Sequence, residues 1–487
     1  MSHDPRPGML SFVEYASKLA GDEKSEAQVF LDRLFQAFGH KGYKEAGAEL
    51  ESRVRATGKT TRFADLLWSP RVLIEMKKRG EKLLNHYDQA RDYWHDTYPK
   101  PRYVVLCNFD EFWIYDFFNQ SEPVDELRLE DIPQRYLALN FLFPNDPKPQ
   151  FGKDRVKVSR EAAASIAAIF NSLVGRKEDR ERAQRFILQC VFCLFAEDFD
   201  LLPRGLFSGL VEDCHTEHAS SFDLFGSLFS QMNSRQHARG GRFKNVDYFN
   251  GGLFSVVDPI DLNPYEIDLL NEASQQDWSL VQPPIFGALF EGSMDEDERH
   301  AFGAHFTAEA DIKKIVRPTI ERPWIERIEA AKTLKQLRDL RNELAQFQVL
   351  DPACGCGNFL YVAYRELARL ETRILLRIAN EFSRSEIKKE SFELKLSLRQ
   401  FHGIDILPFA VDLTKLTLML GKEQALQEMI ESISLTGLQH DFLLEQRLPL
   451  DNLDKNIVCE DALFCMWPKF DAIIGNPPYQ SKNKILQ

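Results

Sequence analysis

The sequence predicts an α/β multidomain protein with an all-helical middle region, and three patterns support this. In the last third, apolar strand-like runs alternate with helical segments, and the first run breaks into a glycine-rich turn within residues 346–360. Residues 159–277 are mostly of helical pattern, whereas residues 61–116 contain short apolar runs separated by turns. A length of 487 residues fits about three domains. We place these domains at residues 1–145, 157–285 and 286–487.

The composition is that of an ordinary soluble globular chain, with 44% hydrophobic and 28% charged residues. No apolar run approaches the roughly 18 residues that span a bilayer, and the N-terminus lacks a basic-then-apolar leader. We therefore expect a cytoplasmic protein without a membrane partner. The net charge of −13 argues against a protein that coats nucleic acid, but it allows an enzyme with a local basic cleft.

Eight cysteines are scattered without the paired spacing of secreted scaffolds, and we expect reduced thiols. Cys190 and Cys193, with Cys214 and His215 further on, have the residue types of a metal site. The first pair lies in an apolar helical run, residues 186–195, where cysteine is ordinary core filler. Core packing is the better interpretation of this pair.

The first domain combines a helix with two strand-like pieces that carry charged residues. Residues 25–38 have an apolar helical face, and we expect Ser25 to cap this helix. The strand-like pieces present Asp65, Glu75 and Lys77, and the last two lie one pleat apart on the same face of a strand. Two carboxylates can hold Mg²⁺, and a lysine beside them can orient or deprotonate an attacking water.

These residues resemble the PD-(D/E)xK nuclease fold. The resemblance implies that Asp65 and Glu75 are metal ligands and that Lys77 activates the water. It also implies Glu26, on the preceding helix, as a further metal ligand. Asp65 is not preceded by proline, which departs from the family pattern, and a Glu-x-Lys sequence at a strand end is also frequent by chance.

Residues after the Glu-x-Lys strand add to this resemblance. Gln89 and Tyr93 form a Gln-x-x-x-Tyr segment similar to one in several restriction nucleases, and one helical turn puts both side chains on one face. Residues 102–109 and 111–116 are typical of two strands joined by a short turn. Residues 145–156, rich in proline, glycine and charge, then predict a linker.

The middle domain shows no pattern that indicates catalysis. Its helical segments lead to a turn with an apolar pair at residues 250–254. In the last domain, residues 322–345 predict one charged amphipathic helix that packs around the sheet. The first segment leads into the last domain, and the charged helix is most simply a solvated face around the sheet.

Two glycines shape the turn at the start of the last domain. Gly355 and Gly357 let the backbone turn sharply and approach a ligand, while N–H groups of the following helix face the same spot. A nucleotide-like cofactor fits this turn, although such turns also occur without a ligand. Two further apolar runs end at Asp405 and Asp461, which are placed to accept the hydroxyls of a ribose and the exocyclic amine of an adenine ring.

A fourth apolar run delivers Asn476, Pro477, Pro478 and Tyr479 at its carboxyl end. This series of segments resembles the class I adenine-specific amino-methyltransferases of DNA, which use S-adenosylmethionine. The resemblance implies that the Asn476 side chain and the Pro477 carbonyl accept hydrogen bonds from an adenine amino group. Tyr479 would stack on a base extruded from the duplex. Without the resemblance, these residues form a rigid proline turn that closes a strand.

Two further segments belong to the same resemblance. His305, Phe306 and Thr307 precede a helical run and resemble the segment that packs on the methionine part of the cofactor. Phe306 and Thr307 are also typical of a hydrophobic staple and an N-cap. Asp351 and Ala353, in the glycine turn, complete the cofactor-binding set that the resemblance implies.

Over the whole chain, the nuclease-like, helical and methyltransferase-like parts resemble the MmeI-like (type IIL) single-chain restriction-modification enzymes. The resemblance implies a partial Rossmann-like, doubly wound sheet in the last domain. It also implies a bifunctional enzyme acting on double-stranded DNA in restriction-modification and phage defence. Such an enzyme methylates the N6 amino group of adenine with S-adenosylmethionine and carries a Mg²⁺-dependent endonuclease domain.

The sequence departs from this family where it ends, at residue 487, eight residues after Tyr479. We expect the strand order 3-2-1-4 without the later strands, and without the C-terminal part that reads the DNA sequence. Two alternatives stay open. One is a methyltransferase with an inactive nuclease relic, and the other is a truncated, non-catalytic subunit completed by a second polypeptide.

Overall fold

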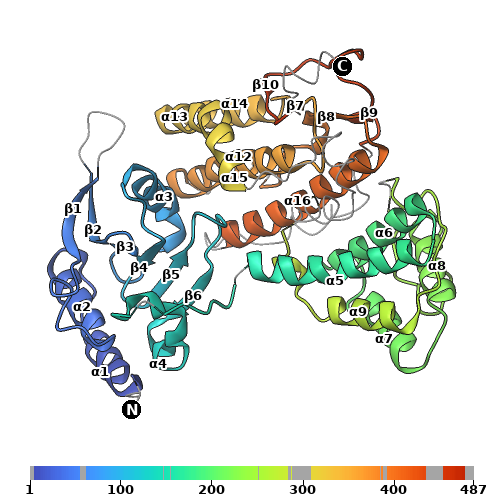
Figure 1. Cartoon of the computed structure of the whole chain (residues 1–487). Helices are drawn as coiled ribbons and strands as arrows, with labels where there is room; N and C mark the ends of the chain where they lie inside the picture. Colours follow the sequence, from blue (N-terminus) through green and yellow to red (C-terminus); the bar gives the residue numbers. More distant parts are fainter. Residues whose placement is uncertain are drawn as a thin grey trace, which may run out of the picture. The chain divides into compact units, whose positions relative to one another are not determined.

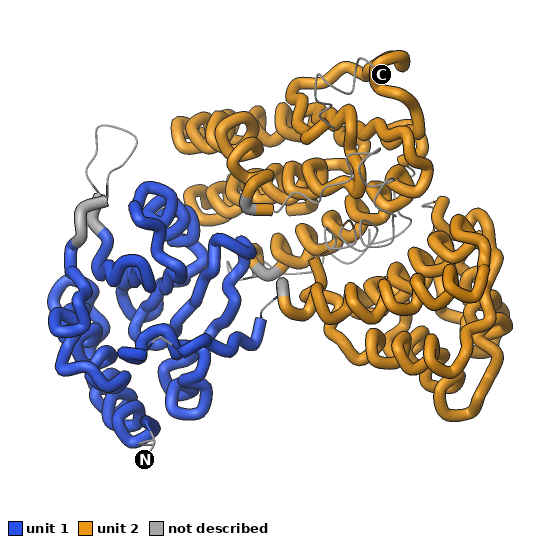
Figure 2. The backbone as a smooth tube through the Cα atoms, viewed as in Figure 1, with its two compact units in different colours: residues 1–156 blue, residues 157–487 orange. Residues whose placement is uncertain are grey.

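The chain forms two compact units, residues 1–156 and residues 157–487 (Figure 2). The computed structural model describes residues 5–54, 62–145, 147–153, 155–249, 252–282, 287, 309–383, 385–387, 392–434 and 453–477. Each unit has its own hydrophobic core. Within the described ranges, no helix combines the length and the apolar character that crossing a membrane requires.

Unit 1 is built on a six-stranded sheet in the order β1-β2-β3-β4-β5-β6 (Figure 1). The strands are β1 (Glu49–Val54), β2 (Arg62–Trp68), β3 (Val72–Met76), β4 (Tyr103–Cys107), β5 (Glu111–Tyr115) and β6 (Asp125–Arg128). Only β3 and β4 run parallel; the other neighbours are antiparallel. All five residues of β3 are buried, as expected for a central strand covered on both faces.

Helices cover both faces of this sheet. They are α1 (Arg6–Ala16), α2 (Glu23–Ala37), α3 (Tyr87–Asp96) and α4 (Ile132–Arg135), with short 3₁₀ turns η1 (Leu83–His86), η2 (Leu129–Asp131) and η3 (Tyr136–Leu142). Alternate residues of β3 face opposite ways, so Ile74 packs in the cluster with α2 whereas Leu73 packs in the cluster with α3. The strand that carries Glu75 is therefore fixed from both sides.

The cap of α2 differs from the sequence prediction. Asp22, not Ser25, is the N-cap residue, and α2 begins at Glu23. The Asp22 carboxylate accepts hydrogen bonds from both the backbone N–H and the hydroxyl of Ser25, at 2.9 Å and 2.8 Å. The Asp22 carboxylate therefore caps the N-terminus of the helix, and Ser25 is the donor to it.

The first part of unit 2 is helical, as the sequence predicts. Its elements are α5 (Arg155–Gly175), α6 (Arg180–Asp198), α7 (Leu206–Thr216), α8 (Ser221–Met232), α9 (Pro264–Ser274) and the 3₁₀ turn η4 (Trp278–Leu280). Cys190 and Cys193 are fully buried in α6, and burial raises the pKa of both thiols. Both therefore act as apolar core residues.

The second part of unit 2 is an α/β domain with a four-stranded parallel sheet in the order β10-β7-β8-β9, which is the predicted 3-2-1-4 order. The strands are β7 (Val349–Asp351), β8 (Phe401–Asp405), β9 (Ile457–Cys459) and β10 (Ala472–Ile473). The helices are α12 (Glu309–Val316), α13 (Arg322–Ala330), α14 (Leu334–Leu344), α15 (Asn358–Glu381) and α16 (Pro408–Ser434), with η5 (Arg317–Glu321) and η6 (Leu398–Gln400). Helices α15 and α16 lie side by side along this sheet (Figure 1).

The predicted single helix over residues 322–345 is wrong, because this segment forms α13 and α14. Thr333 separates them and begins α14 with a capping box, in which its side chain bonds to Gln336 N and the Gln336 side chain bonds back. Such a cap satisfies N–H groups that a continuous helix would bond internally. The amphipathic period continues across the break, so the sequence pattern alone did not reveal it.

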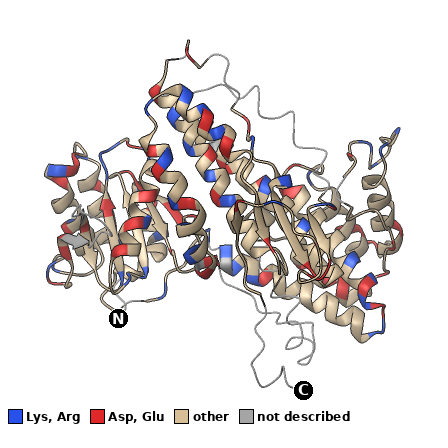
Figure 3. Ribbon diagram, turned by 90° about the horizontal axis from the view of Figure 1, so that it is seen from above, with Lys and Arg blue, Asp and Glu red and all other residues tan. Residues whose placement is uncertain are grey.

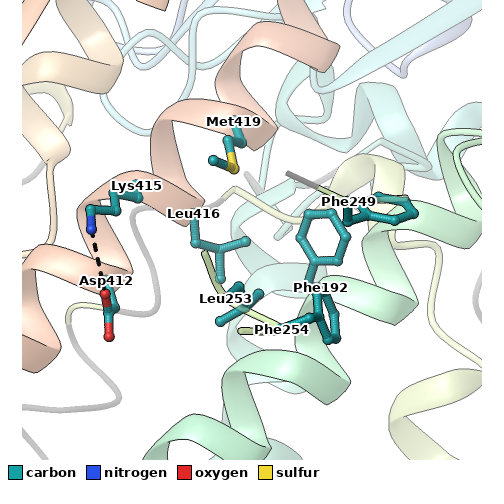
Figure 4. A pocket seen from close by; sticks show the side chains of 8 residues that line it. All are labelled: Phe192, Phe249, Leu253, Phe254, Asp412, Lys415, Leu416 and Met419. Atoms are coloured by element: carbon teal, nitrogen blue, oxygen red, sulfur yellow. Dashed lines mark ion pairs between the residues drawn. The ribbon is translucent and has the colours of Figure 1, made fainter. Parts of the chain in front are cut away.

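Aromatic residues join the helical part of unit 2 to the α/β part (Figure 4). Phe192 of α6 and Phe254, between α8 and α9, face Leu416 and Met419 of α16. The cavity between them measures about 20 Å³, room for about one water. These residues thus form a packed contact that holds α16, and the predicted apolar pair at residues 250–254 contributes to it.

Candidate functional site

The glycine loop joins β7 to α15, and its two glycines serve different purposes. Gly355 and Gly357 both have positive φ, +53° and +82°, which favours glycine. A Cβ at Gly355 would meet no described atom within 4 Å, so this side of the loop is open. A Cβ at Gly357 would lie 3.0 Å from Cγ2 of Thr414 on α16. Gly355 leaves open space beside the loop, and Gly357 allows Thr414 to pack closely against it.

Asp405 ends β8 and holds the glycine loop. Its Oδ2 accepts a hydrogen bond from Gly355 N at 2.9 Å, and its Oδ1 accepts one from Leu407 N at 3.0 Å. Burial raises the pKa of Asp405, against these two backbone donors. Each carboxylate oxygen has a second lone pair, so Asp405 keeps the capacity to accept two hydroxyl groups of a ligand.

Asp351 ends β7 and is fully buried. Its Oδ1 accepts a hydrogen bond from Ala353 N at 3.1 Å, whereas its Oδ2 has no partner among the described residues. Burial, the largest cause, raises the pKa of Asp351 to about 7. A Cβ at Gly475 would lie 2.5 Å from Asp351 Oδ1, so glycine is needed where the chain after β10 passes this carboxylate.

The remaining predicted strand-end residues lie at the same edge of the sheet. Because all four strands run parallel, the segments after their carboxyl ends gather at one edge. Asp461 follows β9, is exposed, and its Oδ1 accepts a hydrogen bond from Leu463 N at 2.9 Å. Asn476 and Pro477 follow β10 and are exposed. The structure thus brings Asp351, Asp405, Asp461 and Asn476 to one edge.

Five predicted residues lie outside the described residues: His305, Phe306, Thr307, Pro478 and Tyr479. Their roles stay predictions.

A second group of polar residues lies in unit 1, on β2 and β3. Lys77 Nζ donates to Glu75 Oε1 at 2.8 Å, and Met76 N donates to Asp65 Oδ2 at 2.7 Å. Glu75 and Lys77 are only 3% and 5% exposed, so this is a buried charged pair. The three residues that the sequence singled out, Asp65, Glu75 and Lys77, therefore lie together.

Helix α3 adds two residues to this group. Gln89 Nε2 donates to Glu75 Oε1 at 2.8 Å and to the Tyr93 hydroxyl at 3.0 Å, so both face the group, as predicted. Glu75 Oε2 is buried and has no hydrogen-bond partner in the described part of the chain. Burial, followed by the charge of Asp65, raises the pKa of Glu75 to about 7. Burial also raises the pKa of Asp65.

Glu26, the predicted additional metal ligand, makes its contacts at the start of α2. Its carboxylate accepts hydrogen bonds from the backbone N–H groups of Ala20, Gly21 and Asp22, and these bonds lower its pKa. Glu23, one helical turn earlier, places Oε1 3.8 Å from Lys77 Nζ. The sequence prediction missed Glu23 because it started this helix at Ser25, whereas α2 begins at Glu23.

The fold and the two sites define a class of protein. A parallel sheet with a glycine loop, strand-end carboxylates and a strand-end asparagine is the arrangement of a methyltransferase domain, here following a helical region and a mixed α/β domain. Three family descriptions match in the same order: the MmeI N-terminal domain over residues 9–176, the MmeI helicase spacer domain over residues 181–254, and the MmeI DNA-methyltransferase domain over residues 327–486. The chain belongs to the MmeI family of restriction-modification proteins.

Individual relatives agree with this assignment. DNA methyltransferase A of Bacillus subtilis (strain 168) is 27% identical over 79% of this chain and 44% of its own length. A putative type II restriction enzyme and methyltransferase of Methanocaldococcus jannaschii is 24% identical over 56% of this chain and 26% of its own. The solved structure of the type IIL restriction-modification enzyme MmeI in complex with DNA has a TM-score of 0.55 at 27% identity, over 66% of this chain and 43% of its own. The chain spans less than half the length of each relative.

Proposed function

We propose that this chain carries the methyl-transfer centre of an S-adenosylmethionine-dependent DNA adenine-N6 methyltransferase. The observation that carries the proposal is the sheet edge where the open glycine loop, Asp405 and the Asn476 segment lie together. Membership of the MmeI family and its DNA-methyltransferase domain supports it. The solved relative is in complex with DNA, which supports DNA as the substrate.

In this proposal, S-adenosylmethionine supplies the methyl group. Asp405 binds the ribose hydroxyls, since its oxygens keep lone pairs beyond the bonds to Gly355 N and Leu407 N. Asp461 takes the adenine amine of the cofactor. Asn476 and Pro477 accept hydrogen bonds from the amino group of the target adenine and orient its nitrogen. Tyr479 stacks on the flipped base.

The test is transfer of a labelled methyl group to duplex DNA. Protein with labelled S-adenosylmethionine should place the label on N6 of adenine, and Asn476→Ala should reduce transfer by roughly 100-fold or more, because it removes a group that orients the reacting nitrogen. S-adenosylmethionine binding should persist in Asn476→Ala. Label on cytosine, or full activity in Asn476→Ala, would contradict the proposal.

A second candidate function rests on unit 1. We propose a Mg²⁺-dependent DNA endonuclease site at Asp65, Glu75 and Lys77, with Glu23 in place of Glu26 as the additional acid. The buried Glu75 Oε2 without a described partner supports it, because a buried carboxylate oxygen is costly unless it binds something.

The residues present fit a magnesium ion. No cluster of three or more His, Cys, Asp or Glu residues with metal-binding geometry occurs among the described residues. Mg²⁺, however, usually takes one or two carboxylates and completes its shell with water and substrate phosphate. Asp65 and Glu75 would hold the ion, which polarises the scissile phosphate. Lys77, held by Glu75 and Glu23, would orient the attacking water.

Cleavage of duplex DNA with Mg²⁺ tests this site. We expect Lys77→Ala to abolish cleavage, whereas Lys78→Ala, its exposed neighbour, should cleave like the wild type. Equal cleavage by both variants would refute the assignment. A wild type that binds DNA without cutting it would instead favour the inactive nuclease relic. Co-purification of another chain would favour the subunit completed by a second polypeptide.

A further inference from the structure

Thr414 lies under the glycine loop and has no part in the chemistry proposed above. It belongs to α16, and its side chain is fully buried. Its hydroxyl donates to the Gly355 carbonyl at 2.8 Å and lies 3.6 Å from Cys354 Sγ. Thr414 is therefore bound to the backbone of the loop itself.

The loop is held at Gly355 through both of its backbone groups. Asp405 accepts from the Gly355 N–H at 2.9 Å, and Thr414 donates to the Gly355 carbonyl at 2.8 Å. Glycine has wide backbone freedom, so these two bonds select one orientation of the peptides around it. Without the hydroxyl, the carbonyl would lose its partner, and those peptides could rotate.

Packing adds to the hydrogen bond. A Cβ added at Gly357 would lie 3.0–3.1 Å from Cγ2, Cα and Oγ1 of Thr414. The Cβ direction of Gly355, by contrast, is open for at least 4 Å among the described atoms. Thr414 thus packs against the loop at Gly357 and leaves the space at Gly355 open.

We propose that Thr414 is a positioning residue that sets the affinity of the chain for its nucleoside cofactor by fixing the glycine loop. This inference rests on the proposed methyltransferase function. Thr414 acts through the Gly355 carbonyl and not by contact with the cofactor.

The same helix offers a matched control. Thr417 is 1% exposed on α16, and its hydroxyl has no hydrogen-bond partner in the described structure. Thr417→Val therefore makes the same chemical change in the same helix without removing a bond to the loop. Thr414→Ser keeps the hydroxyl and removes only the methyl group.

The experiment is titration of the full chain with S-adenosylmethionine, well below the thermal midpoint of every variant, so that the folded fraction does not affect the result. Thr414→Val should bind about three- to tenfold more weakly, the effect of one lost hydrogen bond. Thr414→Ser and Thr417→Val should stay within about twofold of the wild type. Amide exchange in the 352–358 peptide should rise in Thr414→Val only.

Two results would overturn the inference. If Thr414→Val binds as the wild type does, the loop needs no support from the hydroxyl. If Thr414→Ser, which keeps the hydroxyl, loses as much affinity as Thr414→Val, the loss follows any change of packing at residue 414 and not the hydrogen bond. A wild type that fails to bind S-adenosylmethionine would refute the proposed cofactor site itself, and this inference with it.

Discussion

Asp351 and Glu75 are buried carboxylates, one in each unit, and each has one oxygen without a described partner. Burial is the largest cause that raises the pKa of each to about 7. Such groups are costly in the folded state when charged. Their position near strand ends, beside a glycine loop in one case and a lysine in the other, is typical of sites that bind ligands.

Asp351 makes the stability of unit 2 depend on pH. Its pKa rises from the ordinary 3.8 to about 7 on folding, so its contribution is fully present below pH 4 and is lost as pH rises towards 7. The resulting decrease in the free energy of unfolding amounts to as much as about 4 kcal/mol. Asp351→Asn should remove this dependence, because asparagine does not titrate and its oxygen still accepts from Ala353 N.

Urea denaturation followed by amide exchange in α15 peptides measures this effect for unit 2 alone. Between pH 5 and pH 8, the unfolding free energy of the wild type should fall relative to that of Asp351→Asn. Parallel curves for the two proteins would show that Asp351 titrates normally.

At the scale of elements, the strand–loop–helix of residues 349–381 separates two uses of glycine. Alanine at either Gly355 or Gly357 pays about 1–2 kcal/mol for its left-handed backbone. Gly357→Ala should be the more destabilising change, since its Cβ also meets the buried Thr414. Gly355→Ala should weaken S-adenosylmethionine binding more than its effect on stability explains. Its Cβ would point into the open space that the proposed cofactor site uses.

Thermal unfolding and cofactor titration of the two variants test this difference. Equal losses of stability and of affinity in both would mean that the two glycines are equivalent.

The sequence predicted the parts of the fold that depend on local pattern. The apolar runs and the glycine turn predicted the strands and the loop of the last domain, and the Glu-x-Lys spacing brought Glu75 and Lys77 together. The strand order 3-2-1-4 followed from the family resemblance and is confirmed. It could not separate α13 from α14, because the amphipathic period continues through Thr333. Nor could it identify Thr414, whose role depends on the packing of α16 against a loop about 60 residues earlier.

Glu23 shows a similar limit. The sequence prediction started the helix at Ser25 and so placed Glu23 outside it, whereas residues 23 and 26 lie on one face of α2. Only the backbone conformation of residues 20–22, which bonds to Glu26, leaves Glu23 as the acid facing Lys77.

At the scale of the whole molecule, the two candidate sites lie in different compact units. Acidic and basic residues are interspersed along the helices (Figure 3), so the net charge of −13 is not a single acidic block. The two proposed functions, modification and cleavage, therefore belong to different units of one chain.

Titration calorimetry with S-adenosylmethionine tests the central claim most directly. The wild type should bind one equivalent, and Asp405→Ala should weaken binding at least about tenfold, the effect of losing hydrogen bonds to a carboxylate. Asp268→Ala, which removes a carboxylate on α9 near His215, should bind like the wild type. Absence of binding by the wild type, or equal binding by Asp405→Ala, would contradict the cofactor site.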